Sequence, residues 1–530
     1  MRSFRLPALT VCVLITWVSV VLGQDKPAAE TPDRVAYKQA VLQKDARARI
    51  EALRKFLAAY PKSGRAHLAK ELILKTLVQN WPQGLAEIRD QVKRMTTGVD
   101  PDDKLDALDT VADILVTNGA SQKDLTEIAA RVETAALKSF DEKRLFAQQK
   151  RQSAGAKMPV ADATLRHYVD EVHADLLTTM GRIEVARGNT AKGQLLLEQA
   201  HKTDAENSQA AAELGELALQ AGRKTDALDL LVSAQLSGKP TLEQRQHLEE
   251  LFKTLHPGEA GGLDAWLDQA YRGKYPENIH VEPYKTTDHS KTVLAELFTG
   301  AGCSPCAAAD VALDAAMERF GKRDLVVLMY HEHIPEPDPM ANPVTLKRLL
   351  FYGAMGTPTL EVDGESLTGG GSRSDAPSFY ARVQPKIEAE LKSAPGASLT
   401  VSASRSGSVV TVHARAESAK PLRLQIALAE KQLRYSGENG IRFHPMVVRA
   451  MADGFALNEP VETTFDVSQI SADLKSYLDD YEITNDRFGP IHFSEKKYSI
   501  DPANLAVVAF VQDMETKRVL QATYLEPDAK

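Results

Sequence analysis

Two cysteines, Cys303 and Cys306, are the residues whose type and spacing point most directly to chemistry. They form a C-x-x-C pattern at a predicted turn from a strand to a helix, in the segment ELFTGAGCSPCAAAD (296–310). Unpaired backbone N–H groups and the positive end of a helix dipole favour a thiolate at the first of two such positions. Cys303 is therefore the expected nucleophile, and Cys306 is the residue expected to resolve a mixed disulfide.

The same spacing fits two other roles. Zinc sites use it, and His331 and His333 would supply two further ligands if a strand continued through both and placed them on one face. A zinc or copper site is one alternative, and a purely structural disulfide is another, although so short a loop stabilises little. The two histidines could also line the rim of the site or simply mark a polar strand end. Redox exchange is the interpretation that we prefer.

Strands and helices are predicted to alternate around the cysteines. Residues 293–299 form an apolar strand, and the helix after the cysteines has Pro305 just inside its start and Gly321 just past its end. A near-continuous apolar run over 324–331 is typical of a buried parallel strand. A proline-rich loop, a helix near 345–354, a hairpin at Asp363-Gly364 and a helix over about 376–393 follow. The predicted order is βαβ, α, ββ, α.

This stretch resembles the thioredoxin superfamily. More narrowly, it looks like an exported bacterial thioredoxin-like family of unassigned function with an ELFTSQGCxxCPPAD-type segment and a TPQ-x-x-VDG pattern, matched here by residues 296–310 and by TPTLEVDG (357–364). The match covers about 80 to 105 of the 530 residues. The resemblance implies a thioredoxin-like fold and a redox-active Cys303–Cys306 pair, with no known substrate.

The resemblance also suggests roles for Thr357 and Pro358, about 50 residues after the cysteines. Thioredoxin folds place a cis-proline there beside the disulfide, whereas a trans turn proline is the alternative. If the bond is cis, the Thr357 backbone would face Cys303 and pair with a bound substrate. Thr357 and Gly302 are the predicted substrate-binding residues. Thioredoxin has a tryptophan before its first cysteine where this chain has Gly302, and this departure limits what the resemblance implies.

Thioredoxin has a buried aspartate beneath its disulfide, and this role is predicted to fall to Glu296 on the preceding strand. A buried carboxylate there would accept the proton of Cys306 during resolution. The alternative is that Glu296 leaves the sheet toward solvent.

Residues 34 to about 270 have a helical composition and contain a repeat of 34 residues. Gly181 and Leu197, for example, recur as Gly215 and Leu231. This is the tetratricopeptide period, so we expect an α-solenoid of about five to six irregular helix pairs whose face could bind a protein partner. A passive helical spacer is the alternative.

The domain organisation follows from these changes of pattern. We predict a signal peptide over 1–23, a helical repeat region over 24–275, a thioredoxin-like α/β domain over 276–395 and an all-β sandwich over 396–530, where short segments alternate with period two. An uncleaved N-terminal anchor is the alternative to the signal peptide.

The net charge and the expected cellular compartment exclude some classes of function. The net charge is -8 and no basic stripe is present, so a nucleic-acid partner is not expected. Signal cleavage would leave Cys303 and Cys306 as the only cysteines of an exported, periplasmic or extracellular protein with no membrane segment.

The sequence thus predicts a thioredoxin-like protein disulfide oxidoreductase. Its substrates would be protein thiols or disulfides, it would need a redox partner protein, and no cofactor is expected. Two alternatives stay open: a non-catalytic protein-binding scaffold made of the repeats and the sandwich, and a metal-handling protein that uses Cys303, Cys306, His331 and His333.

Overall fold

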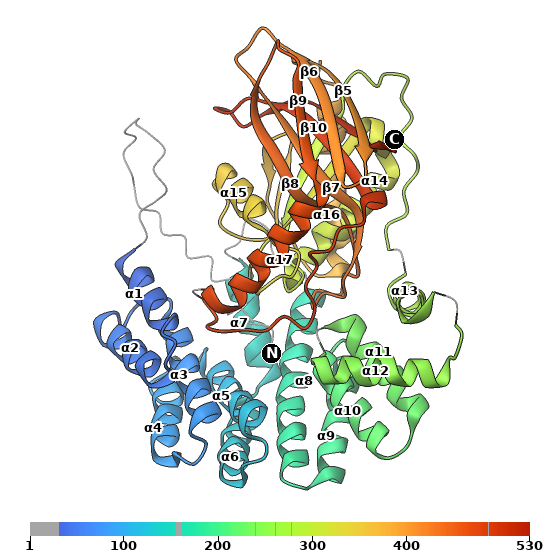
Figure 1. Ribbon diagram of the computed structural model, residues 1–530. Helices are drawn as coiled ribbons and strands as arrows, with labels where there is room; N and C mark the ends of the chain where they lie inside the picture. Colours follow the sequence, from blue (N-terminus) through green and yellow to red (C-terminus); the bar gives the residue numbers. More distant parts are fainter. Residues whose placement is uncertain are drawn as a thin grey trace. The chain divides into compact units, whose positions relative to one another are not determined.

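The computed structural model describes residues 31–529, apart from 155–161, 239, 260, 277 and 486. The predicted signal peptide therefore lies outside the described residues. The chain divides into a helical unit, which comprises the described residues up to Leu231 together with Asp480–His492, and a sheet unit, which comprises Val232–Asp479 and the residues from Phe493 onward (Figure 1). Across the described ranges, no helix is both long and apolar enough to cross a membrane.

The N-terminal half is helical, as predicted. Its helices are α1 (Pro32–Val41), α2 (Ala46–Ala59), α3 (Ala66–Asn80), α4 (Leu85–Thr96), α5 (Lys104–Gly119), α6 (Lys123–Ser139), α7 (Glu142–Ala154), α8 (Asp162–Ala186), α9 (Thr190–Thr203), α10 (Ser208–Gln220), α11 (Lys224–Ser237), α12 (Leu242–Leu255) and α13 (Gly262–Lys274). Where the structure describes the connections, neighbouring helices are joined by short turns, and the apolar face of each helix is buried against its neighbours.

The 34-residue repeat corresponds to a repeated contact between helices. A Cβ atom added to Gly181 of α8 would lie 2.8 Å from Cγ of Leu197 in α9, and one added to Gly215 of α10 would lie 2.8 Å from Cγ of Leu231 in α11. Only glycine allows either leucine to approach its partner helix so closely. The repeated residues therefore position successive helix pairs in the same way.

A segment from near the C-terminus belongs to the helical unit. The Tyr37 hydroxyl donates a hydrogen bond to the Arg487 carbonyl (2.9 Å). Gly489 packs so closely on Leu72 that an added Cβ would lie 2.9 Å from Cδ1 of the leucine. Residues 480–492 are thus held by α1 and α3, more than 400 positions away in the sequence.

The sheet unit contains two sheets. The larger sheet has the strand order β11-β10-β7-β8-β2-β1-β3-β4, and the smaller has the order β12-β5-β6-β9. The strands are β1 (Val293–Thr299), β2 (Leu325–His331), β3 (Thr359–Val362), β4 (Glu365–Leu367), β5 (Ser398–Ser406), β6 (Val409–Glu417), β7 (Arg423–Arg434), β8 (Phe443–Ala456), β9 (Val461–Asp466), β10 (Leu505–Gln512), β11 (Val519–Leu525) and β12 (Asp528–Ala529).

The strands and helices around the cysteines occur in the predicted order. Strand β1 is parallel to β2 and antiparallel to β3, and β3 pairs with β4 across the predicted Asp363-Gly364 turn. The helices of this region are α14 (Ala307–Asp324), α15 (Pro343–Tyr352) and α16 (Ala376–Leu391).

The two faces of β1 contribute to different cores. Val293, Ala295 and Leu297 pack with residues of α14 and α16, whereas Leu294 and Phe298 pack with α15 and with the C-terminal strands. The cysteines lie at the start of α14, so only the β1 residues on the face that packs against α14 can reach them.

The C-terminal strands do not form a sandwich apart from the strands of the cysteine region. Strand β8 pairs in parallel with β2 at Met329 and Val447, so β7, β8, β10 and β11 extend the sheet that contains β1. The smaller sheet contributes Val410 and Val412 to a second core shared with this extension. The C-terminal region is rich in sheet, as expected.

The expectation that the C-terminal region is all-β is wrong. Helix α17 (Val467–Thr484) follows β9 directly, and Leu474 and Leu478 are buried on it. Ile470, Leu474 and Leu478 are spaced by four residues, which is a helical pattern and not a strand pattern.

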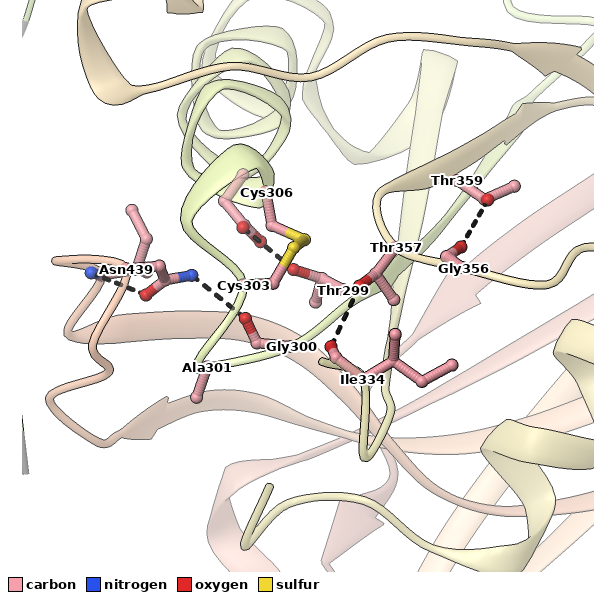
Figure 2. Close-up of a disulfide and its surroundings, with 12 residues drawn as sticks. Thr299, Gly300, Ala301, Cys303, Cys306, Ile334, Gly356, Thr357, Thr359 and Asn439 are labelled. Atoms are coloured by element: carbon pink, nitrogen blue, oxygen red, sulfur yellow. Dashed lines mark hydrogen bonds between the residues drawn. A yellow bond between two sulfur atoms is a disulfide. The ribbon is translucent and has the colours of Figure 1, made fainter. Parts of the chain in front are cut away.

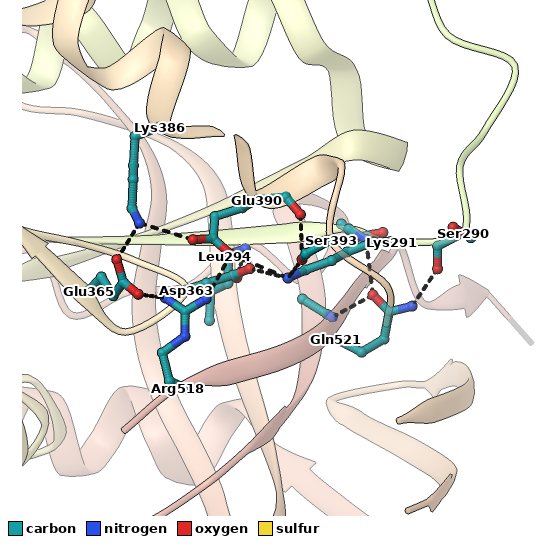
Figure 3. Close-up of polar contacts among 12 residues, drawn as sticks. Ser290, Lys291, Leu294, Asp363, Glu365, Lys386, Glu390, Ser393, Arg518 and Gln521 are labelled. Carbon is teal, nitrogen blue, oxygen red and sulfur yellow. Dashed lines mark hydrogen bonds and ion pairs between the residues drawn. The ribbon is translucent and has the colours of Figure 1, made fainter. Parts of the chain in front are cut away.

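An ion-pair network fixes the end of the sheet that is remote from the cysteines (Figure 3). The Lys291 ammonium, 4% exposed, lies 2.8 Å from Oδ2 of Asp363 at the β3–β4 turn. The guanidinium of Arg518, in the β10–β11 loop, contacts Glu365 at 2.6 Å and Glu390 at 2.7 Å. The β3–β4 hairpin, α16 and the C-terminal strands are thereby joined.

Candidate functional site

Cys303 and Cys306 form a disulfide at the start of α14, with their Cα atoms 5.3 Å apart (Figure 2). A 3-10 turn, Ser304–Cys306, leads from the turn after β1 into the helix, and Pro305 stands at its start as the sequence predicts. Cys303 is 1% exposed and Cys306 is 0% exposed. The disulfide therefore has the predicted position at a helix N-terminus, but solvent does not reach it.

The turn before Cys303, residues 300–302, is held from two sides. The Ala301 N–H donates to Oδ2 of Asp338 (2.7 Å) in the proline-rich loop, which covers residues 332–342. The Asn439 N–H donates to the Ala301 carbonyl (3.0 Å), and the Asn439 side chain donates to the Gly300 carbonyl (3.3 Å). Asn439 belongs to the β7–β8 loop, so the C-terminal region takes part in building the site.

A glycine segment, Gly369–Gly371, lies against the cysteine turn. The Gly371 N–H donates to the Pro305 carbonyl (2.8 Å), and the Ala308 N–H donates to the Gly371 carbonyl (3.0 Å). A Cβ atom added to Gly370 would lie 2.4 Å from the Pro305 carbonyl oxygen and 2.6 Å from Cγ of Pro358. Pro358 is thus close to the cysteines.

The Thr357-Pro358 peptide bond is cis, which confirms that part of the prediction. The Thr357 hydroxyl donates to the Ile334 carbonyl (3.0 Å), as Figure 2 shows. Thr357 is half-buried. Gly302 is buried against Glu336: an added Cβ would lie 3.1 Å from Cβ of Glu336, so a tryptophan would not fit at this position without movement.

The structure does not bring Glu296 to the disulfide. Glu296 is 1% exposed, which excludes the solvent-facing alternative, but it lies on the face of β1 opposite to Thr299 and α14. Its carboxylate accepts two hydrogen bonds from Arg348 (2.7 and 2.8 Å) and others from Tyr330 (2.8 Å) and Tyr352 (2.5 Å). The expectation that Glu296 takes the proton of Cys306 is therefore corrected: it is the partner of a buried arginine.

Asp310 is the buried acid that the sequence analysis missed. It follows Cys306 by four residues on α14, so the two side chains share one face of the helix. Asp310 is 5% exposed, and its Oδ2 accepts a hydrogen bond from the Thr299 hydroxyl (3.0 Å). Burial raises the pKa of Asp310 to about 6. The spacing of Cys306 and Asp310 was the signal available in the sequence.

His331 and His333 do not share one strand face as the metal alternative requires. Strand β2 ends at His331, whose Nδ1 lies 2.9 Å from Oδ2 of Asp338. The His333 ring stacks on Tyr477 (5.8 Å between centroids), and its Nδ1 accepts a hydrogen bond from the Asp338 N–H (2.9 Å). Within the described ranges, no group of three or more His, Cys, Asp or Glu side chains is placed to hold a metal ion.

Comparisons with known proteins give little beyond this geometry. No family model matches the chain, and no curated protein matches it. One solved structure to which the chain is similar is the X-ray structure of a protein from Agrobacterium tumefaciens, with 17% sequence identity over 46% of this chain and 96% of that chain and a TM-score of 0.29. A TM-score this low does not indicate a shared fold. The helical N-terminal region, the α/β sheet and the Cys303–Cys306 disulfide fit a thioredoxin-like C-x-x-C protein.

Proposed function

We propose that the protein is an exported thiol-disulfide oxidoreductase that exchanges disulfides with protein substrates. One observation carries this proposal: the Cys303–Cys306 disulfide lies at a helix N-terminus beside a cis-proline, with the buried Asp310 carboxyl one helical turn away. The strand order β2-β1-β3-β4 with α14, α15 and α16 supports a thioredoxin-like domain.

Each residue has a defined part in the proposed reaction. In the reduced protein the Cys303 thiolate attacks a substrate disulfide, which forms a Cys303–substrate disulfide and releases one substrate thiolate that takes up a proton. Asp310 then accepts the proton of Cys306. The Cys306 thiolate attacks the Cys303 sulfur, re-forms the Cys303–Cys306 disulfide and releases the second substrate thiol. Oxidation of a substrate dithiol is the same sequence in reverse.

The burial of Cys303 adds a requirement. A protein substrate cannot reach a sulfur that is 1% exposed, so the segments beside the cysteine turn must move before attack. The glycine segment is the part that would move: Gly370 is exposed, and the two backbone hydrogen bonds that join Gly371 to Pro305 and Ala308 would have to break. Thr357 and Pro358 would then border the substrate.

The remaining regions would select the substrate and the redox partner. The helices with the 34-residue repeat are proposed to be tetratricopeptide-like and to bind a protein on one face. The signal peptide prediction supports a periplasmic or extracellular location. Thiol-disulfide exchange needs no organic cofactor.

Trapping of the mixed disulfide tests this function. A Cys306→Ala variant keeps the nucleophile but cannot resolve the mixed disulfide. After it is mixed with oxidised proteins extracted from the exported fraction of cells, it should accumulate adducts in which Cys303 is linked to protein substrates. The Cys303→Ala variant, which keeps Cys306 alone, is the matched control and should form few adducts. Equal and low capture by the two variants would contradict the proposal and favour a structural disulfide.

A further inference from the structure

His331 and Asp338 form a buried pair close to the proposed acid Asp310. The His331 ring is 1% exposed, and its Nδ1 lies 2.9 Å from Oδ2 of Asp338. Asp338 is 0% exposed and also accepts hydrogen bonds from the N–H groups of Ala301 (2.7 Å) and Met340 (2.7 Å). Burial alone would raise the pKa of Asp338, but His331 and these N–H groups hold it well below its usual range. Asp338 is therefore ionised and fixes a proton on Nδ1 of His331.

The other ring nitrogen of His331 has no hydrogen-bond partner although it is buried. In the parallel pairing of β1 with β2, His331 is directly opposite Thr299, so both side chains lie on the face covered by α14. Thr299 donates its hydroxyl hydrogen to Asp310. The charge of His331 also lowers the pKa of Asp310, against the larger effect of burial. These observations place His331 and Asp310 on the same face of the sheet, close enough for the charge of the histidine to act on the carboxyl.

Other ionisable groups lie around His331 and Asp310. His444 of β8 lies 5.0 Å from His331 between ring centroids, but burial lowers the pKa of His444 to about 3, so this ring is neutral near pH 7. Its Nε2–H donates to the Tyr435 carbonyl (2.8 Å). Arg373 acts on Asp310 from the loop before α16.

Two more ionisable groups interact with Asp338. Glu332 precedes it in the proline-rich loop, and Arg449 faces it from β8. Burial raises the pKa of Glu332 to about 8, so this carboxyl is protonated near pH 7. Asp314, one turn further along α14, interacts with Asp310, and desolvation raises the pKa of Asp314 to about 8, so it carries little charge near pH 7. His331 is thus the imidazole that faces the two carboxyl groups of Asp338 and Asp310.

We propose that His331, held by Asp338, is a positioning residue that keeps Asp310 ionised and ready to accept the proton of Cys306. This inference rests on the proposed function and adds to it the group that controls the buried acid. The His331 charge, held by the contact between Nδ1 and Asp338, stabilises the Asp310 carboxylate on the face of the sheet that α14 covers. When Cys306 loses its proton to Asp310, the disulfide closes and the proton leaves with the released substrate thiol, so no further reactant is needed.

The test follows the pH dependence of resolution by Cys306 in the full chain. Each protein is reduced, mixed with a small aromatic disulfide, and the release of the second thiol is followed across pH. His331→Gln removes the charge of His331, and Asp338→Asn removes the carboxylate that holds the His331 ring. Either change should move the inflection that Asp310 gives in the curve of rate against pH upward by about one pH unit. His413→Gln is the control, since His413 is an exposed histidine on β6, and it should leave the profile unchanged.

A second measurement separates this inference from the proposed function. The ring nitrogens of His331 can be followed by NMR in the reduced, resting protein, where no exchange reaction occurs. Asp310→Asn should shift the NMR signals of the His331 ring nitrogens, since it removes a negative charge from the same face of the sheet, whether or not the protein acts on other proteins. Unchanged His331 ring-nitrogen signals in Asp310→Asn, together with unshifted pH profiles in folded His331→Gln and Asp338→Asn, would overturn the inference.

Discussion

The Thr299 hydroxyl donates a hydrogen bond to Oδ2 of Asp310 across 3.0 Å, and this contact fixes a buried carboxyl one helical turn after Cys306. Thr299 ends β1 and Asp310 lies in the first turns of α14. The strand and the helix that carry the cysteine turn between them thus share a polar contact inside an apolar core.

Asp310→Asn should slow resolution by Cys306 and leave the first attack by Cys303 nearly unchanged. The amide keeps the hydrogen bond from Thr299 but cannot accept a proton, and general-base assistance of this kind contributes about 10²-fold or more in rate. Rapid-mixing measurements of the two steps would separate them. Glu318→Gln, at an exposed carboxyl two turns further along the same helix, is the matched control and should leave both rates as in the unchanged protein. Equal slowing of both steps in Asp310→Asn would contradict the role of Asp310.

Glu296→Gln should lower the free energy of unfolding without changing redox behaviour. The variant leaves the Arg348 guanidinium, which is buried beside Gln512, without its carboxylate partner. Removal of one member of a buried ion pair costs about 3–5 kcal/mol. Urea unfolding measures this cost. Asp453→Asn breaks an exposed pair with Lys347 and should cost less than about 1 kcal/mol. A loss of exchange activity in folded Glu296→Gln would restore Glu296 as a site residue.

Glu332→Gln should make stability depend less on pH. Burial raises the pKa of Glu332 to about 8 in the folded chain, and one of its oxygens has no hydrogen-bond partner. The unfolded chain loses this proton near pH 4.5. Because the folded state binds more protons than the unfolded state in this window, folding loses stability as pH rises, by up to about 1.4 kcal/mol per pH unit.

Unfolding measured by urea at several pH values between about 5 and 8 tests this prediction. The unchanged protein should lose stability with rising pH relative to Glu332→Gln. Glu417→Gln, at an exposed position on β6, is the control and should follow the unchanged protein. Parallel curves for all three proteins would show that Glu332 is already ionised in the folded state.

Local patterns in the sequence predicted the elements nearest the cysteines. The strand 293–299 has the predicted bounds. The predicted hairpin at Asp363-Gly364 is also present, and both turn residues adopt the positive φ angles, 47° and 77°, that such a turn requires. Such features depend on a few neighbouring residues, so their signals lie close together in the chain.

The features that were not predicted depend on long-range contacts. Asn439 reaches the cysteine turn only because β8 pairs with β2, and nothing in either strand specifies that pairing. Glu296 was given the role of the acid beneath the disulfide because a strand that is buried on both faces shows no alternation of polar and apolar residues, so the pattern does not say which face Glu296 occupies. Asp310 could have been found from its spacing to Cys306, but its burial depends on the contact with Thr299.

An equilibrium redox titration of the Cys303–Cys306 couple against glutathione and dithiothreitol buffers tests the central claim most directly. Disulfide exchange predicts a couple that equilibrates with these buffers, at a potential between about -120 and -270 mV. The lower end of this range would indicate a reductase and the upper end an oxidant or isomerase. A potential well below about -300 mV, or a disulfide that does not equilibrate in the folded protein, would contradict exchange and indicate a structural bond.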